Sequence, residues 1–139
     1  MMGDPAWMLL YLGKPWKAGA AGPHAYDCWH LFRAVQKHRF GRDIPVLAFV
    51  EGVVPSLEDQ RATIMRERRY RWEPVDRPKE GDAVVTQRPL HIGVWLPYAG
   101  GGVLHAVEEV GVVWTKDRDW RALGFGERTC YRHSPNEKD

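Results

Sequence analysis

The second half of the chain consists of short apolar runs separated by turn residues, and this pattern restricts the fold more than any other feature. The runs are rich in valine and other residues that favour strands, and glycine or charged residues lie between them. This pattern is typical of antiparallel strands joined by tight turns. The predicted strands are residues 83–86, 91–96, 103–107, 110–114 and 128–132.

The first half of the chain has helical features instead. Residues 5–12 are predicted to form a short helix that ends at Gly13. A Gly-, Pro- and Ala-rich loop follows, and Asp27 is a suitable N-cap for a helix that begins at Cys28 and ends near residues 40–41. A second, arginine-rich helix is predicted for residues 56–70.

Helices that precede strands in the chain predict an α+β fold with segregated elements. The chain has 139 residues, which fits a single domain covering residues 1–139. We therefore expect N-terminal helices packed on an antiparallel sheet of about five strands.

Composition excludes several classes of protein. The formal net charge is only +2, which does not argue for a nucleic-acid partner. Two cysteines do not make a disulfide framework. The sequence has neither a secretory signal pattern nor an apolar run long enough to span a membrane. We expect synthesis in the cytoplasm and no membrane span.

Cys28, His91 and His105 are the candidates for chemistry. A thiol at a helix start lies near backbone N–H groups and the positive end of the helix dipole, which favour the thiolate. A histidine within hydrogen-bond reach takes the thiol proton, and a third polar group orients that histidine. His91 suits the first role, and His105 suits the second if its strand is the neighbour of the His91 strand.

Each of these residues also has a structural interpretation. A cysteine that begins an amphipathic helix is often simply buried, and a histidine in an apolar strand is often a satisfied core residue. Cys28 and His30, together with the strand histidines, are also a possible zinc set, although a spacing of one residue is unusual for zinc. The sequence therefore predicts no metal and no cofactor.

Four segments together resemble the NlpC-type (NlpC/p-sixty) papain-like cell-wall peptidases. They appear in the family's order and cover most of the chain. They are an N-terminal loop, the nucleophile motif, a Gly-Asp turn with its strand, and two histidine strands: residues 11–19, 26–29, 81–85, and 91–96 with 103–106. The resemblance implies Cys28 as nucleophile, His91 as general base and acid, and His105 as the orienting residue.

The chain departs from the family pattern around the nucleophile. Trp16 occupies the loop position where family members usually carry a tyrosine near the oxyanion, and an indole N–H also donates hydrogen bonds. Trp29 and His30 follow the cysteine where Ser-Gly is common. With Asp27, these residues are candidates for the oxyanion site or the substrate groove.

The Asp-Cys-Trp form and the stretch at residues 41–45 are most similar to the subgroup encoded beside phage and prophage tail genes. The resemblance implies hydrolysis of amide bonds in peptidoglycan stem peptides, with stem peptides and other tail proteins as partners and with tail or cell-wall localisation. Two alternatives remain open: a catalytically silent tail-tip module, and a delivered effector or acyl-transfer enzyme on the same fold. The role of residues 42–80 is also open.

Overall fold

The computed structural model describes residues 3–44, 72–87 and 89–133, and within them it shows an α+β fold. One α-helix and short 3-10 helices accompany a six-stranded antiparallel sheet in the order β1-β6-β2-β3-β4-β5. The helical elements are η1 (Pro5–Leu10), α1 (Cys28–Phe40), η2 (Tyr98–Gly100) and η3 (Asp117–Leu123). The strands are β1 (Trp72–Val75), β2 (Ala83–Gln87), β3 (Leu90–Leu96), β4 (Gly102–Val107), β5 (Gly111–Lys116) and β6 (Thr129–His133).

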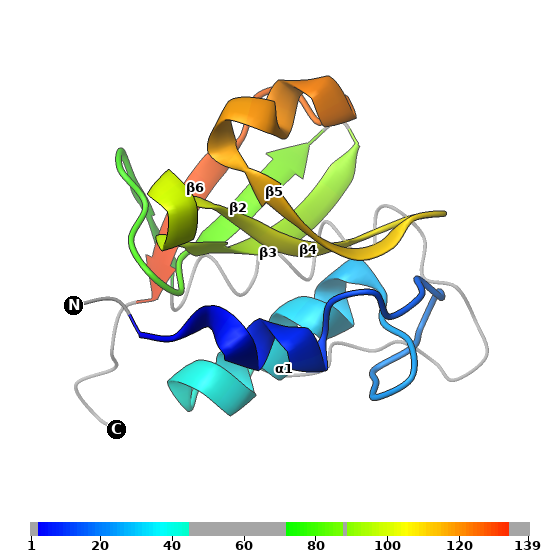
Figure 1. Cartoon of the computed structure of the whole chain (residues 1–139). Helices are drawn as coiled ribbons and strands as arrows, with labels where there is room; N and C mark the ends of the chain where they lie inside the picture. Colours follow the sequence, from blue (N-terminus) through cyan, green and yellow to red (C-terminus); the bar gives the residue numbers. More distant parts are fainter. Residues whose placement is uncertain (1–2, 45–71, 88, 134–139) are drawn as a thin grey trace.

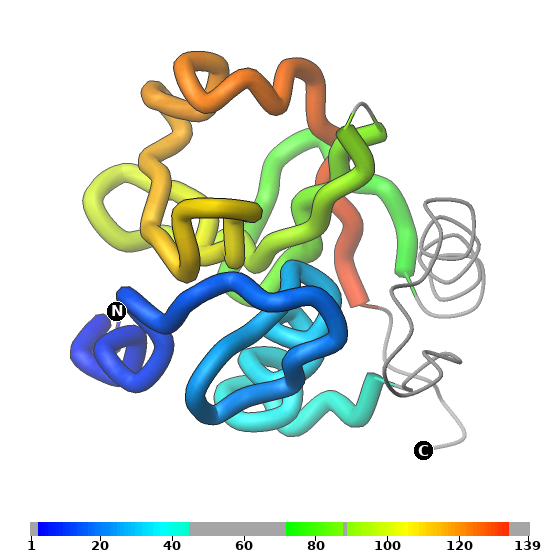
Figure 2. The backbone as a smooth tube through the Cα atoms, turned by 90° about the vertical axis from the view of Figure 1, so that its right-hand side faces the viewer, coloured from blue at the N-terminus to red at the C-terminus, as the bar shows by residue number. Residues whose placement is uncertain are grey.

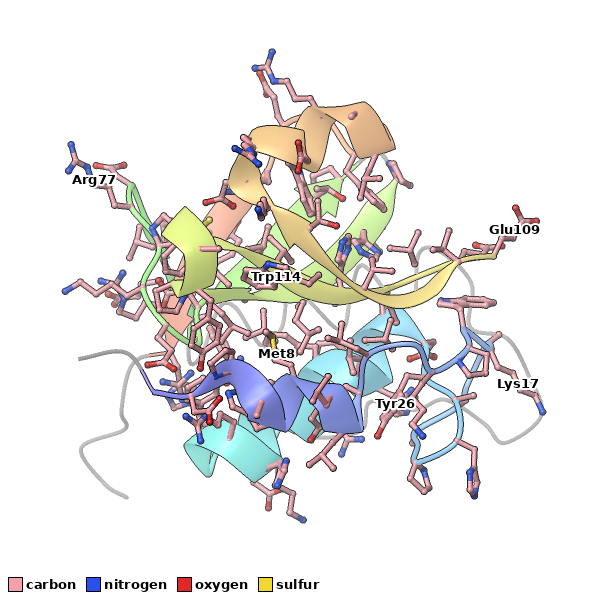
Figure 3. The ribbon with its side chains drawn as sticks, in the orientation of Figure 1. Met8, Lys17, Tyr26, Arg77, Glu109 and Trp114 are labelled. Carbon is pink, nitrogen blue, oxygen red and sulfur yellow. The ribbon has the colours of Figure 1, made fainter. Side chains whose placement is uncertain are left out.

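The sheet separates two layers of different size. Figure 1 shows α1 and η1 on one side of the sheet and η3 on the other, and the turned view in Figure 2 shows the same separation. Met8 points from η1 toward the sheet and is buried (Figure 3). The main core therefore lies between α1, η1 and the sheet, and a smaller cluster lies under η3.

Alternation along β3 and β4 divides their side chains between these two layers. Ile92 and Val94 belong to the main core, as does Leu104 on the neighbouring strand. Val103 belongs instead to the cluster that contains Trp120 and Phe125. Because successive side chains of a strand point to opposite faces, His91 and His105 lie on the same face as this second cluster.

Local hydrogen bonds define both ends of α1. The Asp27 side chain accepts a hydrogen bond from the backbone N–H of His30 at 2.7 Å, which satisfies a donor that the first turn leaves free. Gly41 adopts a left-handed conformation (φ 68°), and its N–H reaches the carbonyls of Gln36 and Lys37. The predicted bounds of this helix are confirmed.

The Gly81-Asp82 turn ties the end of α1 to the sheet. Gln36 Nε2 donates to the Gly81 carbonyl at 2.9 Å, and Arg42 Nη1 donates to the same oxygen at 3.1 Å. The buried Asp82 carboxylate accepts from the guanidinium of Arg132 on β6. This turn precedes β2, as expected, and connects three elements.

The structure also corrects several expectations. The short helix predicted for residues 5–12 is present as the 3-10 helix η1, which ends at Leu10, before the predicted stop at Gly13. The sheet gains β1, which contains Pro74 and pairs only with β6; a proline is compatible with an edge strand because it is not needed as a donor there. The helix predicted for residues 56–70 lies outside the described residues.

No helix in the described ranges is long and apolar enough to cross a membrane.

A substitution at Gly93 on β3 tests how closely the two histidine strands approach each other. A Cβ atom there would lie 2.5 Å from Val103 Cγ1 and 2.9 Å from His105 Cβ. We expect Gly93→Ala to lower the free energy of unfolding by about 1–3 kcal/mol, because the strands must shift apart. Urea unfolding measures this, with Gly3→Ala as the control because only the flexible end of Arg39 lies near Gly3. Equal unfolding midpoints for the two variants would contradict the packing.

Candidate active site

The side chains of His91 and His105 meet in the interior of the protein. His91 Nε2 and His105 Nδ1 are 2.7 Å apart and share a hydrogen bond, and the two residues are 6% and 0% exposed. Their strands β3 and β4 are neighbours, with Val94 paired to Leu104. The structure therefore places His105 where the sequence predicted an orienting group for His91.

Three further residues complete this cluster, and the sequence did not single them out. Thr115 on β5 places its Oγ1 2.9 Å from His105 Nε2. Phe125 stacks on the His91 ring with centroids 4.4 Å apart, and Trp120 lies 5.3 Å from the His105 ring. No sequence signal pointed to them, because nothing local indicates which aromatic rings reach the histidines.

Cys28 approaches the same part of β3 from the α1 side of the sheet. It is the first residue of α1, which packs on β3 and β4, and its sulfur lies near the backbone N–H of Ile92. The residue keeps some exposed surface, but its sulfur is enclosed. Within the described ranges, no hydrogen bond joins Cys28 Sγ to His91. The structure thus joins the two histidines, and it places the thiol beside Ile92, the residue that follows His91, with no direct hydrogen bond to the His91 ring.

Burial, rather than the helix dipole, dominates the acidity of the thiol. Enclosure and then the negative charge of Asp27 raise the pKa of Cys28 from 9.0 to about 12, although the N–H groups of Ile92, Trp29 and Cys28 itself act in the opposite direction. The sequence predicted a lowered pKa from the helix start. That expectation is wrong for this arrangement, because removal from water destabilises the thiolate more than the nearby backbone dipoles stabilise it.

The two histidines are also held in their neutral forms. Burial, with a smaller effect of His105, lowers the pKa of His91 from 6.5 to about 3. Burial lowers the pKa of His105 to about 4. At neutral pH the site therefore contains a neutral thiol and two neutral imidazoles.

Trp16 lies beside the residues that precede the nucleophile. Its segment forms a parallel bridge with Tyr26: the Tyr26 N–H donates to the Pro15 carbonyl, and the Lys17 N–H donates to the Tyr26 carbonyl. The half-buried Trp16 packs against the main core. The loop thus folds back on the start of α1, which is where an oxyanion donor is expected. No hydrogen bond of the Trp16 indole N–H is seen in the described part of the chain.

The other groove candidates are part of the packing at the helix start. Asp27 Oδ1 lies 2.8 Å from His30 Nδ1, and Asp27 Oδ2 accepts from the Gly19 N–H at 3.0 Å. Trp29 is 4% exposed and stacks on Phe32, and its buried indole N–H has no hydrogen-bond partner among the described residues. The 5% exposed His30 and Trp29 thus face the interior rather than an open groove.

No group of three or more His, Cys, Asp or Glu side chains in the described ranges is arranged to hold a metal ion. His30, part of the possible zinc set, instead contacts Asp27. The sequence matches no model of a known protein family, and it matches no curated protein. The interpretation of the site therefore depends on its own geometry.

Asp27 offers a direct test of the thiol's environment. We expect Asp27→Asn to lower the pKa of Cys28, because the amide keeps the helix cap but removes the negative charge. A fall of one pKa unit gives a rise of about tenfold in thiolate at neutral pH. Iodoacetamide labelling at several pH values, read at Cys28 by peptide mass spectrometry, measures this change. Asp4→Asn, at the N-cap of η1, is the matched control; equal rates in both variants would exclude the charge effect.

The buried histidines should also make stability depend on pH. Their pKa values are lower in the folded protein than in the unfolded chain, so the unfolded chain binds protons first as the pH falls. We expect the free energy of unfolding to be constant between about pH 7 and pH 8, where neither these histidines nor the Cys28 thiol of the unfolded chain titrates strongly. It should fall between about pH 6.5 and pH 4, by up to about 1.4 kcal/mol per pH unit for each proton. Urea unfolding across this range should show a shallower slope for His105→Gln and no change for the exposed His24→Gln.

Proposed function

We propose that this protein is a cysteine peptidase with a papain-like fold that hydrolyses amide bonds in peptidoglycan stem peptides. The observation that carries the proposal is the 2.7 Å contact between His91 and His105 on neighbouring strands, beside a helix that begins at Cys28. Cysteine hydrolases need a thiol, a base and a group that orients the base. The resemblance of four sequence segments to NlpC-type peptidases supports the choice of substrate.

The proposed reaction is acyl transfer through Cys28. In the reactive state, which differs from the resting one because no hydrogen bond joins the two side chains at rest, the sulfur attacks the amide carbonyl while His91 removes the thiol proton. The nitrogen for this step is Nδ1, since Nε2 of this ring is engaged with His105. The proton that His91 took from the thiol then passes to the leaving amine, and water releases the acyl group from the sulfur. Because both partners are neutral at rest, proton transfer accompanies the attack rather than preceding it.

The start of α1 supplies donors for the developing oxyanion. The backbone N–H of Cys28 belongs to the first turn and has no partner within the helix. Trp16, held against Tyr26, is the proposed second donor. The proposed setting is a phage or prophage tail that delivers the enzyme to the cell wall.

One observation favours a second candidate, a catalytically silent tail-tip module. Phe125 covers the His91 ring face to face, and the pKa of the Cys28 thiol is raised. A structural module has no need to open this arrangement, whereas an enzyme must expose both groups to its substrate. Turnover separates the two candidates.

The test is incubation of the purified protein with peptidoglycan fragments, with products followed by mass spectrometry. We expect the wild type to release cleaved stem peptides and Cys28→Ala to lose at least about a thousandfold in rate. Cys130→Ala is the matched control, because Cys130 lies in the cluster under η3. A folded wild type that cleaves no fragment would favour the silent module, and an active Cys28→Ala would reject the nucleophile.

A further inference from the structure

Two consecutive hydrogen bonds join His91, His105 and Thr115, and the two possible directions of donation along them are not equivalent. His91 Nε2 contacts His105 Nδ1, and His105 Nε2 contacts Thr115 Oγ1. Each neutral imidazole carries one N–H, so the chain has two possible directions. In the outward direction each ring donates toward Thr115. In the inward direction the Thr115 hydroxyl donates to His105, and His105 donates to His91.

The two directions leave different numbers of groups unbonded. The only hydrogen bond of the Thr115 hydroxyl in the described part of the chain is the one to His105. The outward direction therefore leaves the buried hydroxyl hydrogen without an acceptor and His91 Nδ1 without a donor. Within the described residues, the inward direction leaves only the His91 Nδ1–H without a protein partner. The outward direction is less favourable, because it also leaves the hydroxyl hydrogen unsatisfied and a buried polar group without a partner is costly.

The groups that surround the pair do not reverse this preference. Phe125 covers His91, and Trp120 and Phe125 cover His105. The single polar atom of these rings, Trp120 Nε1, already donates to the Gly126 carbonyl. Burial keeps both imidazoles neutral, so the comparison concerns the neutral pair.

We propose that the Thr115 hydroxyl sets the resting tautomer of the candidate base, holding the ring proton of His91 on Nδ1. In this state His91 is a donor at Nδ1 and does not accept the thiol proton. When the pair takes up a proton, both outer nitrogens carry hydrogen, so the hydroxyl must rotate and accept from His105 Nε2. Thr115 is thus a positioning residue that acts on His91 through His105.

As a statement about tautomers, this inference stands on the contacts alone; as a statement about regulation, it rests on the proposed function. A site that rests with His91 protonated at Nδ1 is not ready for attack. Substrate binding, or an opening of the site, must first reverse the direction of these two hydrogen bonds. Thr115 remains bonded to His105 after this reversal, because its hydroxyl can accept from His105 Nε2 as well as donate to it.

The test is ¹⁵N NMR of the imidazole nitrogens at pH 7.5, in protein labelled at histidine. We expect His91 in the wild type to show a protonated Nδ1 and an unprotonated Nε2. Thr115→Ser should retain this pattern. Thr115→Val should lose it, with a substantial population of the Nε2–H tautomer, because without the hydroxyl the two directions leave equal numbers of unbonded groups.

The exposed His24 serves as the reference for a ring without a fixed tautomer. His91→Gln and His105→Gln assign the signals of these two histidines, which distinguishes them from the buried His30. A wild-type His91 protonated at Nε2, or a Thr115→Val spectrum identical to the wild type, would overturn the inference. The readout needs no turnover, so an inactive protein with the expected spectra would reject the proposed function and leave the tautomer assignment in place.

Discussion

The hydrogen bond between His91 and His105 depends on how closely β3 and β4 approach each other. Gly93 makes that approach possible, because any side chain at this position would collide with Val103 and His105. The pairing of the two strands ends at Val94 and Leu104, before either histidine is reached, although both strands continue. The two rings therefore meet beyond the last paired residues of β3 and β4. The start of α1 approaches β3 from the other face of the sheet (Figure 1).

The low polarity of this region governs the chemistry of every titratable group in it. The same enclosure that strengthens the His91–His105 hydrogen bond also penalises charge, so it lowers the pKa of both histidines and raises the pKa of Cys28. Asp27 adds to the effect on the thiol while it caps α1. A single residue thus stabilises the helix that carries Cys28 and opposes ionisation of its thiol.

Local patterns predicted the elements that local interactions define. The Asp27 cap and Gly41 gave correct bounds for α1, because both ends depend on hydrogen bonds within a few residues. Alternating apolar runs predicted β2 to β6 to within a few residues. β1 was missed because Trp72–Val75 becomes a strand only by pairing with the distant β6. Thr115 and Phe125 were missed for the same reason, since the sheet and the return from η3 bring them to the histidines.

By itself, the sequence determined an α+β fold, the helix that begins at Cys28, and two histidines on separate strands. Short-range hydrogen bonding and the period of apolar residues are properties of adjacent residues, so they can be read along the chain. Only the tertiary structure decided the charge state of the thiol, the packing of Phe125 on His91 and the contact of Thr115 with His105. Enclosure and hydrogen-bond partners arise when distant segments pack together, and no local pattern contains them.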